Sequence, residues 1–256
     1  MSHATSIQAA MGRYFGLAGS DRRLLERLER RPRRAAKGES LWSAHAVLGE
    51  LYILQSGWAC TIRDTCEGER QVIELLLPGD ILGLREFTFR RHVTDAYMIS
   101  PGIVCPFPHE DIVDLVAAST PLTIALFAAI GRQEALLSER MLVTLHHTAR
   151  AQIAHFVIET FIRLAKLQPV DPAEMPFPIS QRLLGQILGL SPVHINRTLR
   201  ALERDGIMKK HKAFIVIQDE ARLREMADFD GEYLSDQMDG LRTRLAALDV
   251  RGVTGA

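Results

Sequence analysis

Two short helices joined by a glycine turn are predicted for residues 179–207, and this segment restricts the fold more than any other part of the chain. Ser180 is suited to cap the first helix, and Gly189 is suited to end it in a left-handed conformation. Ser191 can cap the second helix, and Pro192 takes its first position, where a missing N–H costs nothing. Helices joined in this way form a helix-turn-helix.

The second helix has an apolar side and a polar side. Ile195, Leu199 and Leu202 recur at helical spacing and are expected to face inward. Arg197 can donate two hydrogen bonds to one guanine, and Val193 can contact a thymine methyl group. We therefore expect this helix to enter the major groove of double-stranded DNA, with its N-terminus first.

The chain after this helix is predicted to form a wing. Asp205-Gly206 turns it into two short strands with a basic tip at residues 209–212, which suits contact with phosphates. A helix with outward arginines is usually only a solvated face, but caps, turn glycine and basic wing coincide here. The predicted DNA-binding residues are Ser180, Gln181, Arg182, Ser191, Pro192, Val193, His194, Asn196, Arg197, Arg200, Lys209 and Lys210.

Upstream, residues 41–107 consist of short apolar runs separated by turn residues. Runs such as 51–54, 58–62 and 71–77 predict strands of a barrel or double-sheet roll. A long helical run follows from Pro121 to Lys166. Its apolar residues recur at gaps of three and four, which predicts a dimer seam made of Leu142, Leu145, Ala149, Ile153 and Phe156.

Composition limits the class of protein. The 256 residues have a formal net charge of +0, so a DNA-binding surface must be local. The three cysteines form no CxxC pair, which fits a reducing cytosol. Neither a signal peptide nor an apolar stretch long enough to span a membrane is apparent, and we expect a cytoplasmic protein without membrane contact.

The pattern predicts an α+β chain in five parts. These are an N-terminal segment (1–19), a sensor domain (20–120), a dimerisation helix (121–168), a winged helix-turn-helix domain (169–218) and a C-terminal helical extension (219–256). In the extension we expect one helix over 221–229 and a second over 234–248.

These motifs together resemble the cAMP-receptor/FNR (Crp/Fnr) family of bacterial transcription regulators over residues 15–218. The segment LGLSPVHINRTLRALERDGI (188–207) is similar to the recognition segment of the family, and Pro78-Gly79-Asp80 and Gly57 resemble corners of its β-roll. The resemblance implies a cyclic-nucleotide-binding-like β-roll and a homodimer on a palindromic operator. We also expect RNA polymerase as a partner, and no enzymatic activity.

The resemblance does not extend to the effector. Leu84 follows Gly83 where cAMP-binding members have Glu, and Thr94-Asp95 stands in place of Arg-Ser. Asp95 would repel a cyclic phosphate, so cyclic AMP is not the expected effector. A small-molecule effector of another kind would contact the candidate pocket, which consists of Leu84, Arg85, Glu86, Thr94, Asp95, Leu137 and Ser138.

Other modes of control remain open. The iron–sulfur branch of the family requires an N-terminal cysteine cluster, and no cysteine precedes Cys60. Cys60 and Cys66 flank a predicted hairpin and could form a thiol switch, and a regulator without any ligand fits equally well.

The histidines raise the question of haem or another metal, but His146 and His147 point about 100° apart on a helix. We therefore predict no metal site, and nothing in the sequence supports haem. A metal enzyme of the cupin kind is disfavoured, because the roll has no HxH pair followed by Glu and His.

Overall fold

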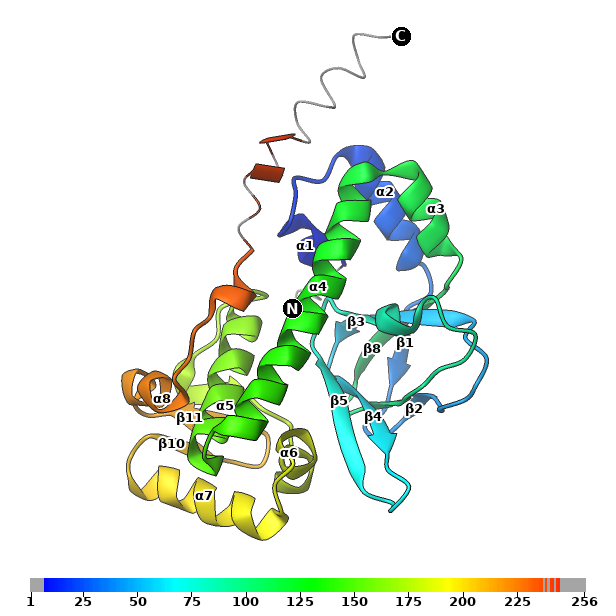
Figure 1. Ribbon diagram of the computed structural model, residues 1–256. Helices are drawn as coiled ribbons and strands as arrows, with labels where there is room; N and C mark the ends of the chain where they lie inside the picture. Colours follow the sequence, from blue (N-terminus) through cyan, green and yellow to red (C-terminus); the bar gives the residue numbers. More distant parts are fainter. Residues whose placement is uncertain (1–6, 237, 239, 242, 245–256) are drawn as a thin grey trace.

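The computed structural model describes residues 7–236, 238, 240–241 and 243–244. A β-roll with flanking helices is followed by two long helices and a winged unit, and the winged unit lies below and to the left of the roll in Figure 1 and contacts it through α6. This mixture of sheets and helices confirms the predicted α+β class. Within the described residues, no helix is both long enough and apolar enough to cross a membrane.

The roll consists of two four-stranded antiparallel sheets in the orders β1-β8-β3-β6 and β2-β7-β4-β5. Gly57 turns the chain between β3 and β4 with φ +85°, and a Cβ there would lie 2.7 Å from the carbonyl oxygen of Pro101. Only glycine fits this turn without strain. The strands are β1 (Arg33–Ala35), β2 (Ser40–Trp42), β3 (Glu50–Ser56), β4 (Ala59–Asp64), β5 (Arg70–Leu76), β6 (Ile81–Leu82), β7 (Asp95–Met98) and β8 (Gly102–Pro108).

Helices cover the end of the roll. The apolar sides of the helices pack with β3 and β8 in one core, which includes Leu25, Phe107 and Leu122. The helices before and after the strands are α1 (Ile7–Gly12), α2 (Gly19–Leu28), η1 (Leu84–Glu86) and α3 (Asp111–Ala118).

The expected single helix from Pro121 to Lys166 is in fact two helices, α4 (Thr120–His146) and α5 (Ala149–Ala165). Thr148 adopts an extended conformation, and its hydroxyl accepts a hydrogen bond from the Ala151 amide at 3.4 Å, so it caps a new helix. The heptad spacing does not indicate this break, because Thr is tolerated within a helix as well as at its N-cap.

The break changes the predicted dimer seam. Ile153 and Phe156 are buried in the chain's own core, so their assignment to a seam is wrong. Leu142 and Leu145, on α4, are 50% and 69% exposed and stay available for a partner. Ala149 is half-buried at the first position of α5.

The winged unit shares a core with α5. Apolar residues of α6, α7 and a small sheet in the order β10-β11-β9 pack against α5. Gln71 of β5 donates a hydrogen bond from its side-chain amide to the carbonyl oxygen of Ile187 at 3.3 Å, so α6 also rests on the roll. The elements are η2 (Pro172–Glu174), β9 (Met175–Pro176), α6 (Gln181–Leu188), α7 (Pro192–Arg204), β10 (Met208–Lys210) and β11 (Phe214–Ile217).

The C-terminal extension begins with α8 (Glu220–Ala227), where a helix was predicted, and it packs on α5. A short turn, η3 (Glu232–Leu234), follows. The second predicted helix, 234–248, falls mainly outside the described residues.

We predict that Phe156→Ala lowers the free energy of unfolding by about 3–5 kcal/mol, because it removes a fully packed ring from the core. Phe156 is 2% exposed, and its ring centroid lies 6.0 Å from that of Phe177. Chemical denaturation measures the change. Val113→Ala, at a position that is 57% exposed on α3, is the matched control and should change stability by less than about 1 kcal/mol; equal losses would contradict the burial of Phe156 in the core.

Candidate DNA-binding and effector sites

The turn between α6 and α7 is fixed by three local features. The hydroxyl of Ser180 accepts a hydrogen bond from the Leu183 amide at 3.1 Å, and that of Ser191 accepts one from the His194 amide at 3.3 Å. Gly189 ends α6 with φ +66°. These interactions confirm the caps and the left-handed glycine predicted from the sequence.

Close helix packing completes the arrangement. A Cβ on Gly185 would lie 2.5 Å from the carbonyl oxygen of Leu190, so only glycine allows the two helices this approach. Ile195 and Leu202 are fully buried and Leu199 nearly so, as expected from their spacing. The inward side of α7 is therefore committed to the core, and its orientation is fixed.

The outward side of α7 forms a shallow, open groove with the start of α6. Val193 is 79% exposed, and Arg197 and Arg200 are exposed without an ion pair to any residue in the described part of the chain. The side-chain amide of Asn196 donates to Gln181 Oε1 at 3.1 Å and ties the two helix starts together. The groove is lined by Gln181, Pro192, Val193, Asn196, Arg197, Arg200, Ala201 and Arg204. This surface offers unpaired cationic donors beside an apolar contact, as reading of base edges requires.

Two predicted DNA-binding residues lie elsewhere. Ser180 and Arg182 line a second groove, between α6 and the roll, together with Arg70 and Tyr97. His194 is half-buried on α7. The sequence could not separate these positions, because all of them lie near a helix start.

The wing lysines are less available than predicted. Lys209 Nζ lies 2.6 Å from Glu203 Oε1, and Lys210 Nζ donates to the carbonyl oxygen of His211 at 2.8 Å. The Lys210 ammonium also lies 5.3 Å from the ring centroid of Phe177, and burial lowers its pKa. Lys210 therefore stabilises the wing, whereas Lys212 at the tip is exposed.

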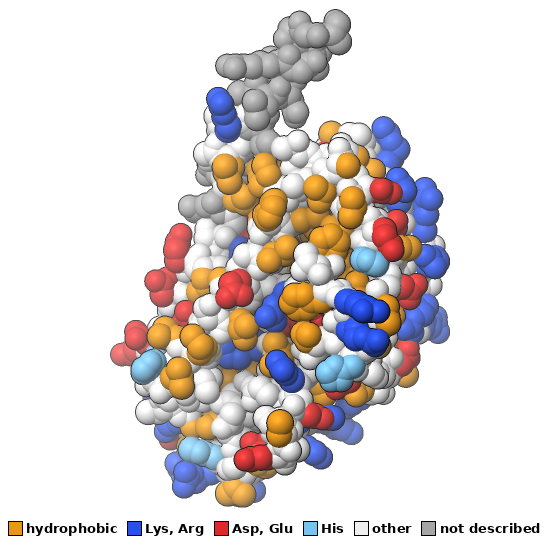
Figure 2. All heavy atoms as spheres, turned by 45° about the vertical axis from the view of Figure 1, so that its right-hand side comes forward, with side chains coloured by type: hydrophobic (Ala, Val, Ile, Leu, Met, Phe, Trp, Pro, Cys, Tyr) orange, Lys and Arg blue, Asp and Glu red, His pale blue; other side chains and the backbone are white. Residues whose placement is uncertain are grey.

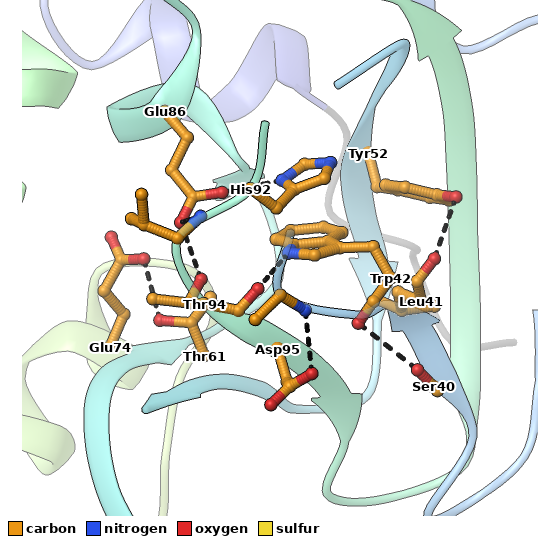
Figure 3. A network of polar contacts seen from close by, with 12 residues as sticks. Ser40, Leu41, Trp42, Tyr52, Thr61, Glu74, Glu86, His92, Thr94 and Asp95 are labelled. Carbon is orange, nitrogen blue, oxygen red and sulfur yellow. Dashed lines mark hydrogen bonds and ion pairs between the residues drawn. The ribbon is translucent and has the colours of Figure 1, made fainter. Parts of the chain in front are cut away.

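In the roll, the part of the candidate effector pocket between β6 and β7 is filled by the chain's own polar network (Figure 3). Buried Glu86 accepts a hydrogen bond from the Thr94 hydroxyl at 2.7 Å, and its other oxygen lies 2.6 Å from His92 Nδ1. The Thr94 carbonyl accepts a hydrogen bond from Trp42 Nε1 at 2.9 Å. Asp95 accepts one from the Ala44 amide at 2.9 Å.

The electrostatics of this network oppose an anionic ligand. Burial alone would raise the pKa of Glu86, but hydrogen bonds from His92 and Thr94 outweigh it and the pKa is lowered. A cyclic phosphate would thus meet an ionised carboxylate that is already fully bonded. Arg85 does not offset this charge, since its Nη1 lies 3.8 Å from Glu74 Oε1.

The remaining predicted pocket residues do not join this network. Leu137 on α4 and Leu84 line a separate, charged cavity between β5, α4 and α5, and Ser138 is exposed. This cavity is not evident from the sequence, because its charged residues come from separate segments between Arg13 and Asp236. Its cations are Arg13, Arg132, Arg140, Arg163 and Lys166, and its carboxylates are Glu74, Asp80 and Asp236.

The cysteines are poorly placed for a thiol switch. Cys60 is buried in β4, and burial raises the pKa of its thiol to about 12, so little thiolate is present near neutral pH. Cys66 is exposed in the hairpin turn. No group of three or more His, Cys, Asp or Glu residues suited to hold a metal ion occurs among the residues that the structure describes.

A winged helix-turn-helix with an outward recognition helix, attached to a β-roll, defines a sequence-specific DNA-binding regulator. Family models agree, since residues 151–226 match the Crp-like helix-turn-helix domain and residues 32–119 match the cyclic nucleotide-binding domain. The chain belongs to the Crp/FNR family of transcription regulators.

Known proteins are similar to this chain over most of its length. The fumarate and nitrate reduction regulatory protein of Vibrio cholerae is 25% identical over 85% of this chain and 87% of its own length. The transcriptional activatory protein AadR of Rhodopseudomonas palustris is 27% identical over 84% of this chain and 85% of its own. The structure of FixK2 from Bradyrhizobium japonicum has the same fold, with a TM-score of 0.69 and 23% identity over 76% of this chain and 96% of that one.

We predict that Arg197→Ala weakens binding to the preferred DNA site by about 1–3 kcal/mol and relaxes selection at one base pair, because a two-pronged base contact is lost. Selection from a random DNA pool, followed by fluorescence anisotropy, measures both effects. Arg30→Ala is the control, since Arg30 is exposed just after α2, a helix that lies at the other end of Figure 1 from α7. Unchanged base selection by Arg197→Ala would contradict the outward facing of this residue.

The change in the free energy of unfolding at acidic pH should reflect the ionisation of Glu86. Because the folded pKa lies below the ordinary value of about 4.3, ionised Glu86 stabilises the fold above that pH and the contribution is lost as pH falls through the folded pKa. We predict that Glu86→Gln is less stable than the parent chain at pH 7 and loses less further stability between pH 5 and pH 3. Chemical denaturation at several pH values measures this difference, and parallel losses in the two proteins would argue against an ionised Glu86.

Proposed function

We propose that this chain acts as a homodimer that binds a palindromic operator and regulates transcription in the cytoplasm. The observation that carries the proposal is the outer side of α7, where Val193, Arg197 and Arg200 are exposed beside one groove. Two such helices in a dimer would enter successive major grooves about 34 Å apart. RNA polymerase would be the protein partner, and the chain would have no enzymatic activity of its own.

Within the predicted five-part division, α4 would supply the dimer seam. Five large apolar side chains are exposed on this helix: Phe127, Ile130, Met141, Leu142 and Leu145. Phe127 and Met141 are two heptads apart and Leu145 follows four residues later, which is the spacing of a two-helix seam. Figure 2 shows apolar side chains exposed among charged ones on one face of the molecule, and large exposed apolar side chains along one helix favour a protein partner.

The break at Thr148 would let the DNA-binding units reorient when a signal acts on the roll. Cyclic AMP does not suit the pocket between β6 and β7, because the negatively charged carboxylate of Glu86 occupies this pocket. Control without any ligand is the alternative. The high thiol pKa of Cys60 disfavours a redox switch.

We predict that Leu145→Glu makes the protein monomeric at concentrations where the parent chain is a dimer, because two carboxylates would be buried at the seam. Analytical ultracentrifugation measures the change. Val113→Glu is the control, since Val113 is 57% exposed on α3, outside the seam. A monomeric parent chain, or a dimer that tolerates Leu145→Glu, would overturn the seam.

A further inference from the structure

The charged cavity between β5, α4 and α5 carries an excess of positive charge. Five cations and three carboxylates line it, and one of the carboxylates, Glu74, is half-buried, with its pKa raised by that burial. The cavity volume is about 70 Å³, which is enough for water molecules, so a larger ligand must displace part of the lining.

Arg140 is the cation with the least compensation. It is 9% exposed, and its Nη1 donates to the carbonyl oxygen of Ile73 at 3.1 Å. Its Nε is buried without a hydrogen-bond partner, and no carboxylate of the described residues lies within 4.0 Å of the guanidinium. Burial lowers the pKa of this guanidinium although Glu159 and Glu74 favour its charge from farther away, so a further anion in the cavity would stabilise it.

The chain already places one carboxylate in this cavity. Asp236, in the C-terminal extension, lies 2.7 Å from Lys166 Nζ through Oδ2 and 2.7 Å from Arg132 Nη2 through Oδ1. Arg132 also donates to the Ser235 carbonyl at 2.6 Å, and Lys166 donates to that of Leu234. Each oxygen of the carboxylate thus contacts one cation, as in the binding of a carboxylate ligand.

We propose that this cavity binds a small organic carboxylate, one of whose carboxylate groups replaces Asp236 between Arg132 and Lys166 while another reaches towards Arg140. The inference rests on the proposed regulatory role and gives it a ligand class. Leu84 and Leu137 of the candidate effector pocket line this cavity, whereas Glu86, Thr94 and Asp95 do not.

Displacement of Asp236 would have a mechanical consequence. Residues 233–236 connect the two helices that the break at Thr148 separates, because Arg132 belongs to α4 whereas Lys166 follows α5. The Tyr233 hydroxyl also contacts Glu159 of α5 at 3.1 Å. A bound carboxylate would break the contacts of residues 233–236 with α4 and Lys166. The helix α5, with the winged unit, could then move relative to α4.

The test uses citrate as the probe, with the full chain and without DNA. Isothermal titration calorimetry at constant ionic strength measures citrate affinity, and Asp236→Asn should bind citrate at least about tenfold more tightly, because the internal competitor loses its charge. Asp228→Asn, an exposed carboxylate near the end of α8, is the matched control and should bind as the parent does.

A second variant and a second readout identify the site. Adding Arg132→Gln to Asp236→Asn should abolish the gain, and citrate should increase hydrogen exchange of the amides at residues 233–236 in the parent chain. Arg197→Ala should keep the citrate response, so a failure of DNA recognition and a failure of this site are distinguishable. Absence of citrate binding to Asp236→Asn, or equal affinity in Asp236→Asn and Asp228→Asn, overturns the proposal.

Discussion

The capping of α5 at Thr148 is the interaction on which the architecture depends. The side-chain amide of Gln152 donates to the carbonyl oxygens of Thr144 at 3.2 Å and His147 at 3.0 Å, so the end of α4 is satisfied where the new helix begins. Because the two helices separate here, α4 stays with the roll and exposes its apolar side, while α5 becomes part of the winged core. Arg150 reinforces this division with a 2.6 Å contact to Asp205 at the end of α7.

The roll and the winged unit use polar side chains in opposite ways. Around Glu86, the hydrogen-bond donors are His92, Val93 and Thr94 of the chain itself, so the network stabilises the corner between β6 and β7 with donors that are already used. On α7, Arg197 and Arg200 have no internal counter-charge among the described residues and remain available to DNA. The cavity at Arg140 combines both situations. Asp236 pairs with Arg132, whereas the Nε of Arg140 has no hydrogen-bond partner.

Local chemistry made several features predictable. Ser180, Ser191 and Gly189 define caps and a turn through interactions with neighbouring residues, and all three occur as expected. Gly57 was predictable for the same reason. The dimer seam was only half predictable, because periodicity describes which side of a helix is apolar and does not say what covers it; the chain's own core covers Ile153 and Phe156.

The sequence by itself therefore determined the helix-turn-helix, the turns of the roll and the outward arginines of α7, since each depends on residues within a few positions of one another. Only the tertiary structure decided which lysines of the wing remain free, which groups hydrogen-bond to Glu86 and where Asp236 binds. These depend on contacts such as Lys210 with Phe177 and Asp236 with Arg132, which join segments 33 and 104 residues apart. Electrostatic and packing energies act through space, and no local pattern records which distant groups they bring together.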